Sequence, residues 1–108
     1  MLKQISRYGT LSLLAIASST MSFAQSAGAD TYKAKCQMCH AADGSGNTPA
    51  GIKLKARPFD SPDVMKEPDA VLIAIIKSGK EKMPAFAGKL TDAQMAEVLA
   101  YIHTLQKK

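Results

Sequence analysis

Three residues near the middle of the chain have the types and the spacing to bind a metal cofactor. Cys36, Cys39 and His40 form the motif C-x-x-C-H. Two intervening residues place both thiols within reach of the two vinyl groups at one porphyrin edge, where they can form thioethers, and the histidine that follows is brought under the iron. The motif therefore predicts one covalent haem c, with His40 binding iron through a neutral imidazole nitrogen.

Three other types of site use similar residues. A thioredoxin-like redox pair requires a strand-to-helix setting, and the sequence has no strand pattern. A zinc site requires a fourth ligand, and the only other histidine in the mature region is His103, far along the chain. A structural disulfide would leave His40 without a role. Haem is the interpretation that uses all three residues.

A second axial ligand decides between electron transfer and ligand binding at the iron. Met38 lies inside the motif, on the face already used by His40, and Met95 falls on an apolar helix stripe. Met83 has the best context, because it follows a predicted helix and precedes Pro84, which biases it toward an extended backbone. We expect Met83 to bind the iron, while Met65 stays possible and His103 is expected to be a surface or boundary residue.

Residues 1–24 have the features of a secretory signal peptide. Lys3 and Arg7 give a positive start, residues 11–17 form an apolar run, and Ser22 and Ala24 make a small-x-small cleavage site. The run is shorter than the roughly 20 residues of a membrane span. We expect cleavage near Ala24, a periplasmic location, and a mature, soluble domain over residues 25–108 without stable membrane insertion.

The mature chain is short and mildly basic. Removing 24 of 108 residues leaves 84, and losing Lys3 and Arg7 lowers the formal charge from +5 to +3. A chain of this length is near the lower limit for folding on its own core, so a large apolar cofactor would supply surface that its few aromatic residues do not. The basic residues are dispersed and no aromatic side chains alternate with them, which argues against a nucleic-acid partner.

The predicted fold class is all-α, with three or four helices and long loops around the haem. We expect a helix over residues 26–38, a glycine-rich loop over 43–51 and irregular structure over 52–60. Ser61 and Pro62 predict a short helix, and a longer one runs from Pro68 to a stop at Gly79.

The last helix has the clearest pattern in the sequence. It begins at Thr91, which forms a capping box with Gln94. Its apolar stripe recurs at spacings of three and four residues and consists of Met95, Val98, Leu99, Ile102 and Leu105.

The chain resembles a small class I monohaem cytochrome c over essentially all of its mature region. In that family a glycine and an aromatic residue precede the first cysteine by eight and four positions, as Gly28 and Tyr32 do here. Residues 98–101, Val-Leu-Ala-Tyr, are similar to the C-terminal helix signature, and Met83-Pro84 matches the Met-Pro loop. Two departures are Ala41, where the family commonly has glycine, and Val98, where leucine is usual.

The resemblance implies roles for further residues. Gly28 would let the terminal helices approach closely, and Tyr32 and Tyr101 would pack at their crossing. The carbonyl of Pro49 would accept the Nδ1 proton of His40 and orient the ring. Tyr32 and Pro49 therefore join Cys36, Cys39, His40 and Met83 as residues of the expected cofactor site.

With both axial positions filled, the expected function is single-electron transport between respiratory redox partners, without enzymatic activity. Several lysines could surround the exposed haem edge and steer membrane or soluble partners with acidic docking surfaces, namely Lys33, Lys35, Lys80, Lys82 and Lys89. The protein is expected to be a monomer. A haem-based gas sensor and a haem subunit of a larger oxidoreductase are the alternatives.

Overall fold

The computed structural model describes residues 19–106, with side chains from residue 26 onward, and this part of the chain contains six helices and no strand. They are α1 (Ser19–Lys35), α2 (Gln37–His40), α3 (Pro49–Leu54), α4 (Pro62–Met65), α5 (Asp69–Ser78) and α6 (Asp92–Leu105). The all-α class predicted from the sequence is confirmed.

The predicted signal peptide falls largely outside the described residues. Residues 19–24, its last part, form the start of α1. Within residues 19–106, no helix is long and apolar enough to span a bilayer.

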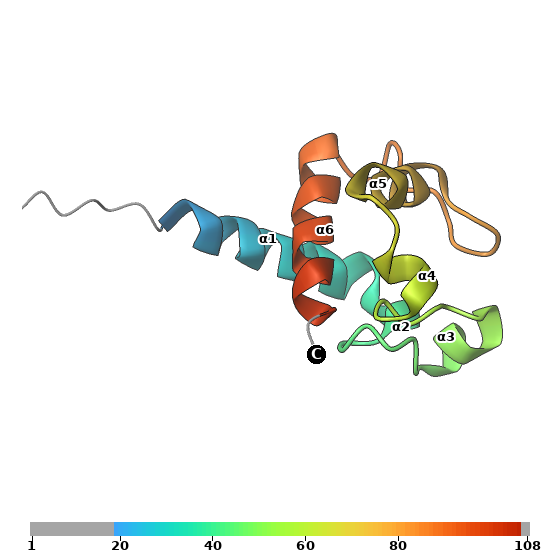
Figure 1. The fold of residues 1–108 in the computed structure, drawn as a ribbon. Helices are drawn as coiled ribbons and strands as arrows, with labels where there is room; N and C mark the ends of the chain where they lie inside the picture. The colour runs from blue at the N-terminus through green and yellow to red at the C-terminus, as the bar shows by residue number, and fades with distance from the viewer. Residues whose placement is uncertain (1–18, 107–108) are drawn as a thin grey trace, which may run out of the picture.

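The two longest helices, α1 and α6, cross each other and make the principal helix packing of the fold (Figure 1). Gly28 lies at the crossing, where a β-carbon would collide with the backbone carbonyl of Glu97. Four residues later, Tyr32 is buried, and its ring lies 5.2 Å from that of Tyr101. The expected roles of Gly28 and of the two tyrosines at this crossing are thus confirmed.

The core lies between this crossing and the helices that follow the first loop. The apolar stripe of α6 supplies much of it, with Met95 and Val98 almost fully buried. Other parts of the chain contribute Phe59, Ile76, Phe86 and Leu90. The stripe predicted from the spacing therefore faces the interior, with Leu105 partly buried against it.

Several helix ends follow their predicted signals. The Thr91 side chain accepts a hydrogen bond from the Gln94 backbone, and the Gln94 side chain accepts one from the Thr91 backbone, which completes the capping box. Pro62 opens α4, and Gly79 follows α5 with a φ of 77°, which glycine adopts without steric cost.

Two predicted boundaries are wrong. The helix expected over residues 26–38 is interrupted at Cys36, so that α1 ends at Lys35 and α2 carries the rest of the motif. Residues 49–54, placed in a loop and an irregular segment, form α3. Thr48 caps it by accepting a hydrogen bond from Gly51, and Pro49 occupies its first turn.

Candidate functional site

A large pocket opens between the motif helix α2, helices α5 and α6, and the loop after α5. Its empty space is about 1270 Å³ when the open mouth is included. Cys36, Cys39, His40 and Met83 all line it. The structure therefore brings four predicted site residues to one cavity, although Met83 lies more than 40 positions from the motif.

The walls of the pocket are mainly apolar. Helix α5 contributes Leu72, Ile75 and Ile76, and further walls come from Leu54, Phe59, Val64, Phe86, Leu99 and Ile102. Such walls suit a broad apolar ligand, because burial of its surface stabilises the complex by roughly 25 cal/mol per Å².

The segment that follows the motif, residues 46–51, holds the backbone of α2. The Thr48 hydroxyl, which caps α3, also donates to the carbonyl of Met38 at 2.7 Å. The Gly46 backbone nitrogen donates to the carbonyl of His40 at 2.9 Å. Gly51 leaves no room for a β-carbon, which would collide with the carbonyl of Cys39. The loop after the motif thus positions α2 by close backbone contacts.

Cys36 and Cys39 are both free thiols. Burial and, to a smaller extent, the negative charge of an ionised Cys39 together raise the pKa of Cys36 to about 11. Cys36 is therefore a neutral thiol at physiological pH. Both side chains line the same pocket, as attachment of the two thiols to one porphyrin requires.

The His40 ring is largely buried and stacks on Phe59, with 4.7 Å between the ring centroids. Burial lowers the pKa of His40, so the imidazole is neutral, which is the form that binds metals. Its Nδ1 atom is buried and has no hydrogen-bond partner among the described residues. The hydrogen bond expected from this atom to the carbonyl of Pro49 is therefore not formed here, and Pro49 is the first residue of α3.

The structure separates the methionine candidates. Met38 and Met65 are 78% and 51% exposed, Met95 is 1% exposed within the core, and none of these three lines the pocket. His103 does not line it either. Met83 is the one candidate second ligand, among the described residues, that does.

The loop carrying Met83 folds tightly back on itself and on α5. The backbones of Lys80 and Met83 exchange two hydrogen bonds, and Phe86 donates from its backbone to Ile76 of α5. At Gly79, a β-carbon would lie 2.6 Å from the carbonyl oxygen of Met83. These contacts fix the backbone of Met83 at the pocket wall.

Tyr32 supports the site without lining the pocket. Its hydroxyl donates to the carbonyl of Ala41 at 2.5 Å, and burial raises its pKa. Ala41 has a φ of 70° and a ψ of 161°, a conformation that glycine adopts far more readily. Tyr32 was expected at the cofactor site, and its contribution is to hold the residue after His40.

Basic side chains lie along the pocket. Of the five lysines expected around the haem edge, Lys35, Lys80 and Lys82 line the pocket, whereas Lys33 and Lys89 do not. Lys55 and Arg57 also line it, and sequence reasoning missed both. Their signal was weak, because they lie in the segment that was expected to be irregular.

Phe59 is a further site residue that sequence reasoning missed. It follows Pro58 in a segment without periodicity, and only the tertiary structure brings its ring to His40. No local sequence signal could have identified it.

The donor set and the walls together fit haem c. Two thiols, a neutral imidazole and a thioether line one apolar pocket. The Nδ1 atom of His40 is buried and forms no hydrogen bond with the described residues. Among the described residues, no group of three or more His, Cys, Asp and Glu side chains could hold a metal ion by itself. The arrangement suits a metal held within a porphyrin, and a one-electron change at that metal.

Comparisons with known proteins point the same way. Residues 23–102 match the family described as "Cytochrome C oxidase, cbb3-type, subunit III". Curated relatives include cytochrome c6 of Synechococcus elongatus, 38% identical over 69% of this chain and 83% of that protein. Cytochrome c6 of Parathermosynechococcus lividus is 36% identical with the same coverage of both chains. Cytochrome c6 of Nostoc sp. is 35% identical over 86% of this chain and 87% of its own.

Proposed function

Because this chain belongs to the class I monohaem c-type cytochromes and carries electrons on one covalent haem c, we propose that His40 and Met83 are its axial ligands. Cys36 and Cys39 would form the two thioether bonds. The bound haem would supply reversible one-electron chemistry at its iron. The observation that carries the proposal is the single apolar pocket lined by all four side chains.

The chain's own residues would then have distinct tasks. Neutral His40 offers a nitrogen lone pair, and its stacking on Phe59 limits rotation of the ring. The loop containing Met83 presents a soft sulfur, which raises the reduction potential relative to a harder ligand pair. With both positions filled by side chains, no substrate reaches the metal. The protein would therefore act as a carrier and not as an enzyme.

We propose a periplasmic location, reached by cleavage near Ala24. The positive start, apolar run and small-x-small site of residues 1–24 support it. N-terminal sequencing of the exported protein tests this proposal, and a mature chain beginning near Gln25 is expected. A chain that retains Lys3 and Arg7 would overturn it.

Optical spectra of the protein purified after expression with cytochrome c maturation test the cofactor and its ligands. Reduced and oxidised spectra should be those of a low-spin haem c, and the haem should stay with the polypeptide in acidified organic solvent. Carbon monoxide should bind poorly to the reduced protein at neutral pH. Rapid binding would instead support a gas-binding protein with a weak or absent Met83 ligand.

We propose that the basic side chains lining the pocket steer acidic redox partners. Lys35, Lys55, Arg57, Lys80 and Lys82 support this, with Glu81 as the acidic exception. Steering by such charges raises association rates by about 10- to 1,000-fold at low salt. The electron-transfer rate with an acidic partner should fall as salt rises, and less steeply in Lys82→Gln. Lys33→Gln is the matched control, because Lys33 lies outside the pocket. A flat salt profile would contradict the proposal.

A second candidate is a haem subunit of a larger oxidoreductase, and the description of the matched family favours it. Large apolar side chains are exposed on the described surface, including Met38 and Ile52 at 78% and 66%. Native gel filtration of a periplasmic extract separates the candidates. A carrier would elute as a small monomer, whereas a subunit would elute with a larger complex.

A further inference from the structure

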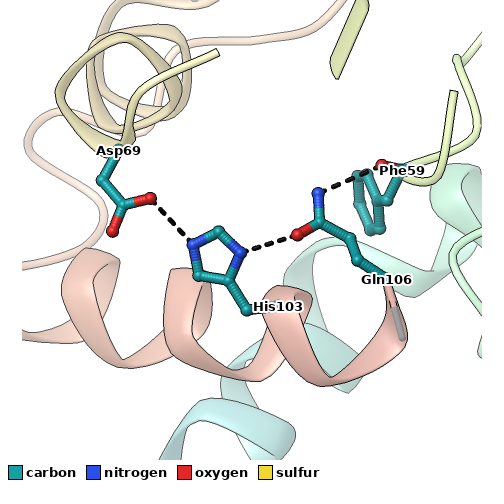
Figure 2. Close-up of polar contacts among 4 residues, drawn as sticks. All are labelled: Phe59, Asp69, His103 and Gln106. Carbon is teal, nitrogen blue, oxygen red and sulfur yellow. Dashed lines mark hydrogen bonds and ion pairs between the residues drawn. The ribbon is translucent and has the colours of Figure 1, made fainter. Parts of the chain in front are cut away.

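A chain of polar contacts connects α5, the end of α6 and the segment that covers His40 (Figure 2). His103 Nε2 lies 2.8 Å from Oδ1 of Asp69, and His103 Nδ1 lies 2.6 Å from Oε1 of Gln106. Gln106 Nε2 donates to the backbone carbonyl of Phe59 at 3.0 Å. The ring of Phe59 then stacks on His40 at 4.7 Å. Four contacts thus lead from Asp69 to the proposed iron ligand.

The geometry of these contacts favours the protonated, imidazolium form of His103. Because the amide nitrogen of Gln106 donates to the Phe59 carbonyl, its amide oxygen must face His103 and can only accept. The carboxylate of Asp69 is likewise an acceptor. Both ring nitrogens of His103 therefore face acceptors, and only the imidazolium form donates from both. The pKa of His103 is accordingly raised, first by the bond to Gln106 and then by Asp69.

Within this row of contacts, Gln106 is buried and His103 is partly exposed. Gln106 is 9% exposed, as is Phe59, so the amide is held away from solvent between two protein partners. His103 is reached by solvent, since 40% of its side chain is exposed. The charged group that faces it is Asp69 of α5, while its partner on α6, Gln106, is neutral.

We propose that His103 and Gln106 are positioning residues for His40: the imidazolium of His103 fixes Gln106, and Gln106 holds Phe59 against the ligand ring. This rests on the function proposed above, because the orientation of His40 matters to electron transfer only when it binds iron. When His103 loses one proton, its ring can donate to only one of its two acceptors, the side chains of Asp69 and Gln106. The hold on Phe59 then weakens, and the orientation of the His40 ring changes with pH.

The test uses the full haem-loaded protein in its oxidised form and follows the haem methyl proton shifts, which report the orientation of the axial imidazole, from pH 5 to 9. In the wild type these shifts should move with the titration of the His103 ring signals, and the reduction potential should fall over the same pH interval. In both His103→Gln and Gln106→Leu, the haem methyl shifts should no longer change with pH over this interval. Thr104→Val is the matched control, because the Thr104 hydroxyl donates to the Tyr101 carbonyl of its own helix, and it should behave as the wild type.

Two outcomes would overturn the proposal. One is a Gln106→Leu protein with wild-type methyl shifts and a wild-type pH profile. The other is a His103→Gln protein whose potential changes while its methyl shifts do not, because charge alone would then explain the effect. Should Gln106→Leu fail to fold, Asp69→Asn leaves the bond from Gln106 to Phe59 in place and should move the titration to lower pH. A titration that stays where it is in Asp69→Asn would also overturn the proposal.

The same samples separate this inference from the proposed function. A wild-type protein without a covalent low-spin haem spectrum would reject the function. A wild type with that spectrum but with pH-independent methyl shifts would reject only the positioning role.

Discussion

The imidazole of His40 and the phenyl ring of Phe59 lie stacked, with 4.7 Å between ring centroids and 25° between ring planes. Phe59 also contacts the ring of Tyr32 edge-on, at 6.2 Å between centroids. One aromatic side chain therefore joins the proposed ligand to the crossing of the terminal helices. This contact links the geometry of the metal site to the packing of the core.

Replacement of Phe59 by alanine should destabilise the protein by about 3–5 kcal/mol, because it removes a large buried ring and leaves a cavity. Urea unfolding of the haem-loaded protein measures this loss. Val71→Ala, at an exposed position on α5, is the control and should cost much less. A Phe59→Ala protein as stable as the control would contradict the role assigned to this ring.

Replacement of Met83 by alanine should open one axial position of the iron. The reduced variant should bind carbon monoxide rapidly, and its reduction potential should fall because a soft sulfur ligand is lost. The control is Met65→Ala, since Met65 is exposed and lies outside the pocket. If Met65→Ala binds carbon monoxide and Met83→Ala does not, Met65 and not Met83 is the axial ligand.

Replacement of Gly28 by alanine should destabilise the crossing of α1 and α6. The added β-carbon would collide with the carbonyl of Glu97, and relief of the clash requires the helices to separate. Overpacking of this kind typically costs about 1–3 kcal/mol, which urea unfolding would detect. Ser26→Ala, at an exposed position on the same helix, should have little effect. Equal stabilities for the two variants would argue against close packing at Gly28.

Replacement of Ala41 by glycine should stabilise the protein. Ala41 has a φ of 70° and a ψ of 161°, a region where a side chain costs about 1–3 kcal/mol. Glycine relieves that cost but gains freedom in the unfolded chain, so a net gain of about 1 kcal/mol is expected in urea unfolding. Ala42→Gly, next in the chain and exposed, is the comparison and should not stabilise. A loss of stability in Ala41→Gly would show that the backbone is not strained there.

The contact between His103 and Asp69 should make stability depend on pH. The raised pKa of His103 means that its contribution is fully present below the unfolded pKa, near 6.5, and is lost as pH rises through the folded pKa. Asp69→Asn weakens this contribution. The gap in urea midpoint between wild type and Asp69→Asn should therefore be larger at pH 5.5 than at pH 8.5. A gap that grows with pH would contradict this assignment.

The local signals in the sequence predicted many individual helix ends correctly. The capping box of Thr91 and Gln94 and the stop at Gly79 depend on neighbouring residues alone, and both are present. Thr48 and Pro49 carry the same kind of signal as Ser61 and Pro62, but the glycines around them suggested a loop. Helix α3 was missed for that reason.

The sequence by itself determined the chemistry of this protein, because C-x-x-C-H places two thiols and an imidazole within five residues. It also determined the buried face of α6, since helical periodicity is local. Only the tertiary structure decided which methionine meets the motif, that Phe59 covers His40, and that Asp69, His103 and Gln106 form one chain of contacts. These relationships join residues that are distant in sequence, and they arise from how the helices pack and not from any local preference of the backbone.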